Sequence, residues 1–422
     1  MKKRETLNFL KAKTYHFLRW GEKYTKTDNI YLTKGGFWLT LGHGVAVLAG
    51  LVLTIGFANL LSKESFGTYK FILSLAGILS SFSLTGLSSV ITRSVARGFE
   101  GSLKIGFLAN LKWSFVVFVG GFAGALYYFL NDNLIVSLSI LIAGSLSPFM
   151  ASASLYGSFL EGKKDFRRQT FYGMGRNIFP AASILTTIFF TDSPLLIILV
   201  YFVSNTLVTL LLYYRILKVY KPSEESESTT ISYGKHLSLM NVISTISNQI
   251  DKVLVFHFLG AAPLAIYTFA IAPVDQLQAG KKFVRILALP KLSSRTAEEL
   301  KISIPQKAKV FFLFSALVSV TYILLAPLFY KFIFPQYIGS VFFSQIYALV
   351  LLFSPAMLFV ETLVAHQKKK ELYIINTGAP VLRIILYVIL LPLYGIMGLI
   401  LALVFVKLLS TTLTIFLFKK SL

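Results

Sequence analysis

The chain has 422 residues, of which 55% are hydrophobic, and carries a formal net charge of +23. Its mean hydropathy is +0.71, whereas soluble domains hold roughly 45–50% apolar residues even when glycine is counted. This composition excludes an ordinary soluble protein and predicts an all-α integral membrane protein that crosses the bilayer many times. The chain contains no cysteine, which excludes disulfides, thiolate metal sites and cysteine nucleophiles.

The first segment, residues 1–35, is basic and has apolar positions at helical spacing, including Leu7, Leu10 and Phe17. This pattern predicts an amphipathic cytoplasmic helix that lies on an anionic membrane surface. The alternative is a solvated basic tail. The segment carries charges throughout and lacks the uninterrupted apolar core of a signal peptide.

From residue 37 onward, apolar runs alternate with short polar loops. A bilayer core needs about 20 apolar residues per helix. We therefore predict twelve transmembrane helices, at residues 37–61, 68–92, 105–130, 134–160, 171–190, 194–217, 236–259, 264–290, 308–330, 340–365, 372–391 and 395–418.

The distribution of lysine and arginine predicts the orientation. Loops on one side of these spans, with both termini, hold 33 basic residues, whereas loops on the other side hold only Lys63, Lys70 and Lys331. Basic residues are retained on the cytoplasmic side, so both termini are expected to be cytoplasmic and the number of spans even. The positive charge is thus a topology signal, and no nucleic acid partner is predicted.

Two short patterns recur in the same order. Residues 57–71, FANLLSKESFGTYKF, align with residues 255–269, VFHFLGAAPLAIYTF, at an offset of 198 positions. The tetrapeptide SPFM at 147–150 recurs as SPAM at 354–357. Repeats of this kind are typical of transporters, so we expect two related halves.

The longest polar stretch between spans is KVYKPSEESESTT, at residues 218–230. Its composition predicts a flexible cytoplasmic linker, 218–235, between an N-terminal six-helix bundle at 36–217 and a C-terminal six-helix bundle at 236–422. Because six is even, both bundles enter from the cytoplasm. The halves would then form a parallel pseudo-repeat about an axis along the membrane normal, with the site in the cleft between them.

Enzyme signatures are lacking. The external loops are very short, and their acids Asp132 and Asp192 stand singly in tight turns. The sequence has no glycine-rich phosphate loop, HExxH motif or Ser/His/Asp signature. We predict no enzyme activity, no catalytic residue, no metal site and no cofactor.

Ionisable residues inside the predicted spans are the most informative, because each is costly if it faces lipid. Asp251 and Asp275 fall near mid-bilayer, and Glu361 lies closer to the cytoplasmic end. We expect these three acids to carry a coupling H⁺ or Na⁺. Asp251 can pair with Lys252, but adjacent side chains point about 100° apart on a helix, so we expect at least one of them to need another partner.

The cations of the spans suggest an anionic substrate. We expect Arg93, Arg176, Lys252 and Arg383 to bind it, because arginine forms bidentate contacts with phosphate. Two further residues, Lys112 and Lys407, are interpreted as snorkelling or packing lysines. His43 and His257 are interpreted as helix histidines whose hydrogen bonds are satisfied.

Three stretches carry recognisable motifs. Residues 58–98 contain a small polar turn, Phe-Gly-x-Tyr, a serine- and leucine-rich helix, and Gly-Leu leading to Arg93. The stretch NQIDKVLVFHFLGAAPLAIYTFA at 248–270 carries Asp251, followed by Leu-Gly and Ala-x-Tyr, and residues 394–398 read YGIMG. These stretches resemble the polysaccharide flippases of the multidrug/oligosaccharidyl-lipid/polysaccharide exporter superfamily, whose seventh helix also bears an Asp. Arg93, Asp251 and Lys252 occupy motif-like positions, whereas Arg176, Asp275 and Arg383 are inferred from depth alone.

The resemblance implies two six-helix bundles around a V-shaped cleft, in the bacterial cytoplasmic (inner) membrane. It implies a flippase that moves undecaprenyl-diphosphate-linked glycan repeat units by alternating access, driven by ion or membrane-potential coupling. Membrane lipids, a polysaccharide polymerase and assembly proteins are the expected partners. The family's drug-exporting branch, working as a cation antiporter, is the main alternative, and an integral-membrane enzyme or scaffold is the other.

Overall fold

The computed structural model describes residues 29–227, 230–279, 292 and 295–421. The helix predicted for residues 1–35 falls mostly outside them. Within these ranges the protein is all-α, without strands. The N-terminal helices are α2 (Asn29–Leu60), α3 (Lys63–Ser80), α4 (Leu87–Ala96), α5 (Ser102–Trp113), α6 (Phe115–Leu130), α7 (Leu134–Ala153), α8 (Tyr156–Gly162), α9 (Phe166–Phe190) and α10 (Pro194–Tyr220).

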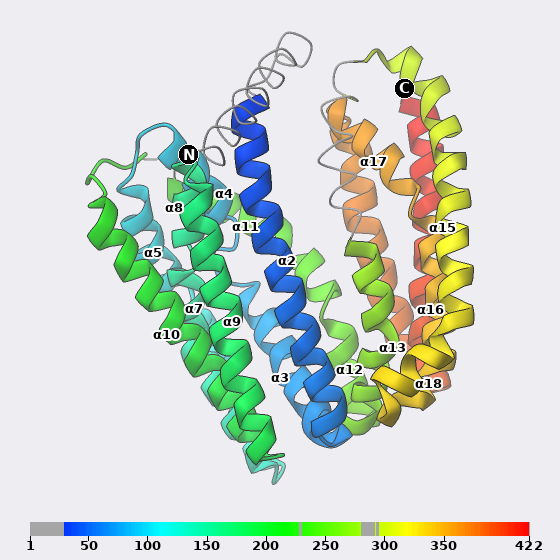
Figure 1. Cartoon of the computed structure of the whole chain (residues 1–422), viewed down its shortest axis with the longest axis horizontal. Coiled ribbons are helices and arrows are strands. Elements are labelled where there is room, and N and C mark those ends of the chain that lie inside the picture. The colour runs from blue at the N-terminus through cyan, green and yellow to red at the C-terminus, as the bar shows by residue number, and fades with distance from the viewer. Residues whose placement is uncertain (1–28, 228–229, 280–291, 293–294, 422) are drawn as a thin grey trace, which may run out of the picture.

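The remaining helices follow a short connection. They are α11 (Thr230–Ser247), α12 (Ile250–Leu259), α13 (Ala261–Ala279), α15 (Ala297–Ile333), α16 (Val341–Tyr347), α17 (Ala356–Ala365) and α18 (Lys369–Ser421), with 3₁₀ turns η1 (Pro335–Ser340) and η2 (Ala348–Phe353). Two groups of helices lie close together at one end and diverge toward the other, which gives the V shape seen in Figure 1. Helix α11 begins at Thr230, so the connection between the groups is shorter than the predicted linker.

Within the described residues, each predicted span falls on one helix or on consecutive short helices. The predicted span 264–290 is described only as far as Ala279, where α13 ends. Seven helical segments of the described chain are long and apolar enough to cross a membrane, and the chain is a multi-pass membrane protein. Helix α18 corresponds to two predicted spans. Its backbone breaks at Gly395, with φ 58° and ψ −143°, and a Cβ on Gly398 would lie 2.1 Å from the carbonyl oxygen of Leu390. The chain therefore reverses at Gly395.

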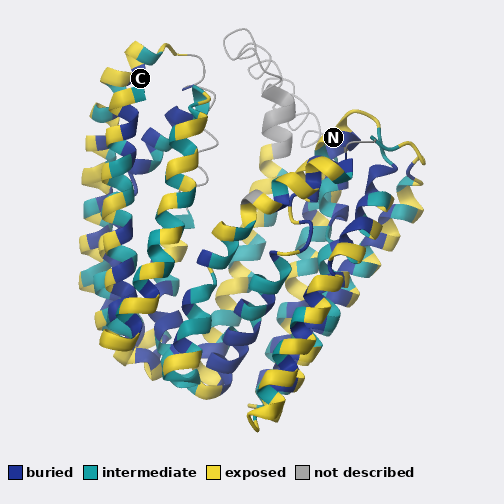
Figure 2. Cartoon of the chain, turned by 180° about the vertical axis from the view of Figure 1, so that it is seen from behind, coloured by how far each residue is buried: buried dark blue, intermediate teal, exposed yellow. Residues whose placement is uncertain are grey.

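Large apolar side chains cover the outside of the helices. Leu211 is 66% exposed and Leu324 is 70% exposed, and Figure 2 shows exposed positions along the outer faces of both groups. Buried positions line the inner faces of the helices. Extended exposed apolar surface of this kind is expected where a protein meets lipid.

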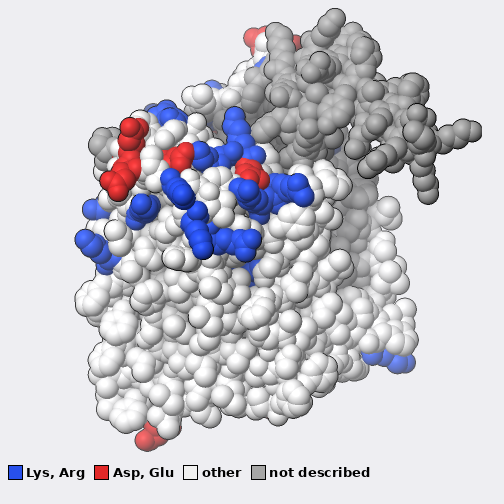
Figure 3. All heavy atoms as spheres, turned by 60° about the vertical axis from the view of Figure 1, so that its left-hand side comes forward, with Lys and Arg blue, Asp and Glu red and all other residues white. Residues whose placement is uncertain are grey.

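The two ends of the molecule differ in charge. One end, which we call the charged end, contains residues 93–104, 161–168 and 215–221 at the tips of α4, α5, α8, α9 and α10. Lys and Arg gather there, above a broad uncharged band (Figure 3). The opposite end, which we call the hairpin end, contains the turns that join α2 to α3 and α12 to α13.

At the hairpin end, the two repeated sequence patterns pack against each other. Phe66 and Phe269 have ring centroids 4.8 Å apart, and Phe71 stacks on Phe256 at 3.9 Å. A Cβ on Gly67 would lie only 1.8 Å from the carbonyl oxygen of Ala261. Glycine therefore allows α3 and α13 to touch backbone to backbone, and this contact holds the two groups together.

Between α3 and α4 the helix is interrupted at residues 81–86, inside the protein. The amide of Leu84 donates to Asn110 Oδ1 at 2.9 Å, and the amide of Gly86 donates to Ser238 Oγ at 2.8 Å. Asn110 in turn donates to Ser152. These bonds satisfy backbone groups that lipid could not satisfy. Through Ser238, α11 is attached to the N-terminal group of helices.

Candidate functional site

The helix formed by α11 and α12 is broken at residues 248–249, and Arg383 of α18 lies against the break. Arg383 Nε and Nη2 donate to Ser247 Oγ at 2.8 and 2.6 Å, and Nη2 also donates to Asn248 Oδ1 at 2.7 Å. Two polar side chains of the predicted seventh span, Ser247 and Asn248, thus contact Arg383, a predicted substrate-binding cation.

Asp251 begins the next helix and is buried, with 6% of its surface exposed. Its carboxylate accepts a hydrogen bond from the hydroxyl of Tyr267 at 2.6 Å and pairs with Lys252 at 3.4 Å. Lys252 Nζ also donates to the carbonyl oxygen of Asn248 at 3.3 Å. Each member of the adjacent pair therefore has a second partner, as their directions on the helix required.

Buried tyrosines lie between Asp251 and Asp275, the two deep acids. Tyr267 contacts Asp251, and Tyr347 donates to Asp275 Oδ1 at 2.8 Å. Tyr387 is buried between them, close enough to interact electrostatically with both carboxylates. A phenol group, which can donate and accept protons, therefore lies beside each of the two predicted ion-coupling acids.

Two lysines extend the positive charge of this region. Lys70 lies close enough to Lys252 to interact electrostatically with it, and Lys407 stands in the same relation to Arg383. The sequence-based placement of Lys70 in an external loop was wrong, because α3 begins at Lys63 and Lys70 is partly buried in its second turn. The ammonium of Lys70 lies over the ring of Phe66 at 5.3 Å.

We use the name central cluster for these residues, which hydrogen bonds, an ion pair or electrostatic interaction link to one another: Lys70, Ser247, Asn248, Asp251, Lys252, Tyr267, Arg383, Tyr387 and Lys407. At 1.5 Å per helical residue, Lys70 and Lys252 lie about 12 Å from the turns of the hairpin end. Arg383 and Lys407, each twelve residues from Gly395, lie about 18 Å from that end. A bilayer core is about 30 Å thick, so these distances from the hairpin end are about 40–60% of that thickness.

Two predicted site residues occupy other places. Arg176 of α9 lies near the hydroxyls of Tyr156 and Tyr201. Glu361 is buried in α17, beside Phe359, which packs against α15 and the end of α18. Lys252 and Arg383 thus both contact Asn248. Arg176 of α9 and Glu361 of α17 are not part of the central cluster.

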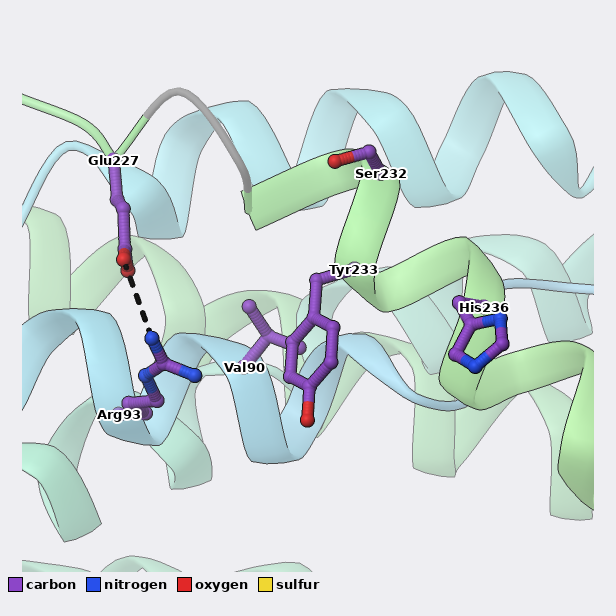
Figure 4. A pocket seen from close by; sticks show the side chains of 6 residues that line it. All are labelled: Val90, Arg93, Glu227, Ser232, Tyr233 and His236. Atoms are coloured by element: carbon purple, nitrogen blue, oxygen red, sulfur yellow. Dashed lines mark ion pairs between the residues drawn. The ribbon is translucent and has the colours of Figure 1, made fainter.

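Arg93 lies at the charged end, in the last turn of α4. Its Nη2 is 3.6 Å from Glu227 Oε1, and its guanidinium lies 5.7 Å from the centre of the Tyr233 ring. A cavity of about 380 Å³ opens here between α4 and α11 (Figure 4), lined by Val90, Arg93, Glu227, Ser232, Tyr233 and His236.

Comparison of the sequence with models of known protein families identifies the family of this chain. Residues 32–280 match the family described as "Polysaccharide biosynthesis protein". The chain belongs to this family. The match covers the first helix group and continues through α11, α12 and α13, so it includes Lys70, Asp251, Lys252 and Asp275. No curated protein sequence matches the chain.

Solved structures share the fold. The chain is similar to the lipid II flippase MurJ in an inward closed conformation, with 15% identity, a TM-score of 0.63, and coverage of 90% of this chain and 87% of that one. It is similar to an outward-facing multidrug resistance MATE transporter of the MOP superfamily, with 13% identity, a TM-score of 0.62, and coverage of 93% and 95%. A MOP superfamily transporter from Pyrococcus furiosus, described as having a binding pocket of reverse polarity, matches with 13% identity, a TM-score of 0.55, and the same coverage.

Sequence reasoning missed several residues of the central cluster. Tyr267 and Tyr387 were not among the predicted site residues, and Lys407 was interpreted as a packing or snorkelling side chain. The presence of tyrosine in an apolar span was an available signal. A buried tyrosine hydroxyl needs a hydrogen-bond partner, so each such tyrosine indicates a polar neighbour. Among the described residues, no three His, Asp or Glu side chains gather to hold a metal ion.

Proposed function

We propose that this protein is a flippase that moves undecaprenyl-diphosphate-linked oligosaccharide repeat units across the bacterial cytoplasmic membrane for surface polysaccharide synthesis. Membership of the polysaccharide biosynthesis family and the fold of MOP transporters support this assignment. In this proposal the protein is a transporter without catalytic residues, and membrane lipids and polysaccharide assembly proteins surround it.

One observation carries the substrate class: cations outnumber anions at mid-bilayer height. The central cluster contains four cations, Lys70, Lys252, Arg383 and Lys407, and one acid, Asp251. Asp275, which interacts electrostatically with Tyr387, adds a second acid. A diphosphate supplies the negative charge that offsets such an excess, and ammonium and guanidinium groups bind it through charge-assisted hydrogen bonds. A site for organic cations would require acids to predominate.

Asp251 and Asp275 are proposed to carry the coupling H⁺ or Na⁺, because each already contacts a tyrosine hydroxyl. Lys252 links the two functions. Diphosphate binding would compete with Asp251 for its ammonium, so substrate and coupling ion would act on one ion pair. Arg176, Arg93 and Glu361 would then contribute outside the central cluster.

The proposed orientation places the charged end in the cytoplasm, together with both termini. The bias of lysine and arginine toward that end supports this orientation. The hairpin end then faces outward. Its close packing at Gly67 would keep the outer side shut while the helix groups diverge toward the cytoplasm.

Reconstitution tests the function directly. Proteoliposomes containing the full chain are supplied with an undecaprenyl-diphosphate oligosaccharide, and translocation is followed by its accessibility to an external probe. Arg383→Ala should slow flipping at least about tenfold, because charge-assisted hydrogen bonds are worth about 1.5–3 kcal/mol. Arg295→Ala removes an exposed arginine before α15 and serves as the matched control.

Each outcome has a distinct meaning. Unchanged flipping by Arg383→Ala would keep the function and reject the central cluster as its site. Efflux of an organic cation by wild type, without lipid flipping, would instead identify the protein as an antiporter.

A further inference from the structure

The connection between the two helix groups is docked on the N-terminal group and does not hang free. The amide of Gly101 donates to the carbonyl oxygen of Glu225 at 2.9 Å. A Cβ on Gly101 would lie 2.6 Å from the carbonyl carbon of Glu224, so only glycine lets the connection lie this close to the start of α5. This backbone contact fixes the position of Glu227, two residues further along.

The Glu227 side chain is held by three groups of α4. Ser94 Oγ donates to Oε2 at 2.7 Å, Arg97 Nη1 lies 3.2 Å from Oε1, and Arg93 Nη2 lies 3.6 Å from the same oxygen. The hydrogen bond from Ser94 and the two arginines lower the pKa of Glu227, so it is a carboxylate at neutral pH.

The charges of this group do not balance. Two guanidinium groups share one carboxylate, and the arginine side chains remain 48% and 53% exposed while Glu227 is 17% exposed. The adjoining cavity brings further donors from α11, since Ser232 and His236 lie on its wall opposite Arg93 (Figure 4). Its volume of about 380 Å³ is within the range of pockets for small ligands.

A carboxylate held by two arginines and a hydroxyl has the same recognition chemistry as a phosphate group. We propose that the cavity between α4 and α11 is a diphosphate-docking site at the charged end, and that Glu227 occupies its arginines until the diphosphate displaces it. This inference rests on the proposed function for its substrate. The cavity would be a second anion site, separate from the central cluster. There the carboxylate of Glu227 competes with the diphosphate for the two arginines.

Displacement has a structural consequence. Glu227 is three residues before Thr230, the first residue of α11, and Thr230 Oγ1 lies 3.4 Å from Ser94 Oγ. Releasing the carboxylate would remove the side-chain contacts between Glu227 and α4, whereas Thr230 and Ser238 would still attach α11 to Ser94 and Gly86. Substrate docking would thereby loosen the connection just before α11.

Binding of inorganic pyrophosphate to the purified full-length protein in nanodiscs, measured by calorimetry, tests the site. Glu227→Gln keeps an acceptor for Ser94 but removes the competing charge, so it should bind pyrophosphate about three- to tenfold more tightly than wild type. Glu225→Gln is the matched control, since it removes the same charge from the same connection while its backbone carbonyl stays on Gly101. The double variant Arg93→Gln/Arg97→Gln should lose this binding.

Equal affinities for Glu227→Gln and Glu225→Gln would overturn the inference, as would unchanged binding by the double arginine variant. The source of the anion is decided by comparing undecaprenyl diphosphate with phosphatidylglycerol vesicles, and equal competition by both against pyrophosphate would refute docking of the substrate. The proposed function is tested separately, because flipping in proteoliposomes does not depend on the affinity for pyrophosphate.

Discussion

Substituting Gly67 by alanine tests whether the backbone contact between α3 and α13 controls access at the hairpin end. The new methyl carbon would lie 1.8 Å from the carbonyl oxygen of Ala261, and such carbons essentially never approach closer than 3.0 Å. The two backbones must therefore move apart by at least 1.2 Å, the difference between these distances.

Overpacking of this kind costs about 1–3 kcal/mol. If only the conformation closed at the hairpin end carries the clash, the population of conformations open at that end should rise by about 5- to 150-fold, since about 1.4 kcal/mol is a factor of ten. We expect Gly67→Ala to favour an open hairpin end and to slow flipping, because the closed state is needed in each cycle.

Because the chain contains no cysteine, spin labels attach only at the cysteines that are introduced. Spin labels on Leu60→Cys and Ile338→Cys, two exposed positions near this end, report its opening by electron–electron distance measurement. Gly50→Ala is the control, since a Cβ at Gly50 meets nothing within 4 Å. A distance distribution for Gly67→Ala that matches wild type and Gly50→Ala would refute the reasoning.

Two further predictions concern the central cluster. Asp251→Asn leaves Lys252 without its carboxylate and should destabilise the protein by about 3–5 kcal/mol in thermal unfolding in detergent, whereas Asp251→Asn/Lys252→Gln should recover most of that loss. Purely additive effects would contradict this coupling. Lys70→Gln should reduce flipping about tenfold or more, while Lys63→Gln, at the hairpin end, should not. Equal effects of the two lysine substitutions would remove Lys70 from the site.

The repeated pattern was visible in the sequence, but the packing of its two copies against each other was not. The alignment at an offset of 198 positions places Tyr69 on Tyr267 and Phe71 on Phe269, and all four side chains are buried in one core. Sequence comparison alone could not show that the two copies pack on each other. That contact depends on the missing side chain of Gly67 and on the angle at which two helices approach.

The predicted linker illustrates a second limit. Its serine- and glutamate-rich composition predicted a flexible segment, yet the backbone at Glu225 docks on Gly101 and Glu227 binds the arginines of α4. Composition reports the average tendency of a segment to fold by itself. It does not contain the complementary surface that another helix supplies.

Hydropathy and charge bias were sufficient to determine that this chain is an all-α, multi-pass membrane protein. These properties depend on local transfer free energies, which add up along the chain irrespective of packing. The same register predicts deep positions for Asp251, Lys252 and Arg383. Only the tertiary structure decided which charges meet, because the rotation of each helix and the break before α12 depend on neighbours far away in sequence. Lys70 approaches Lys252 for this reason, and the positive character of the central cluster depends on that approach.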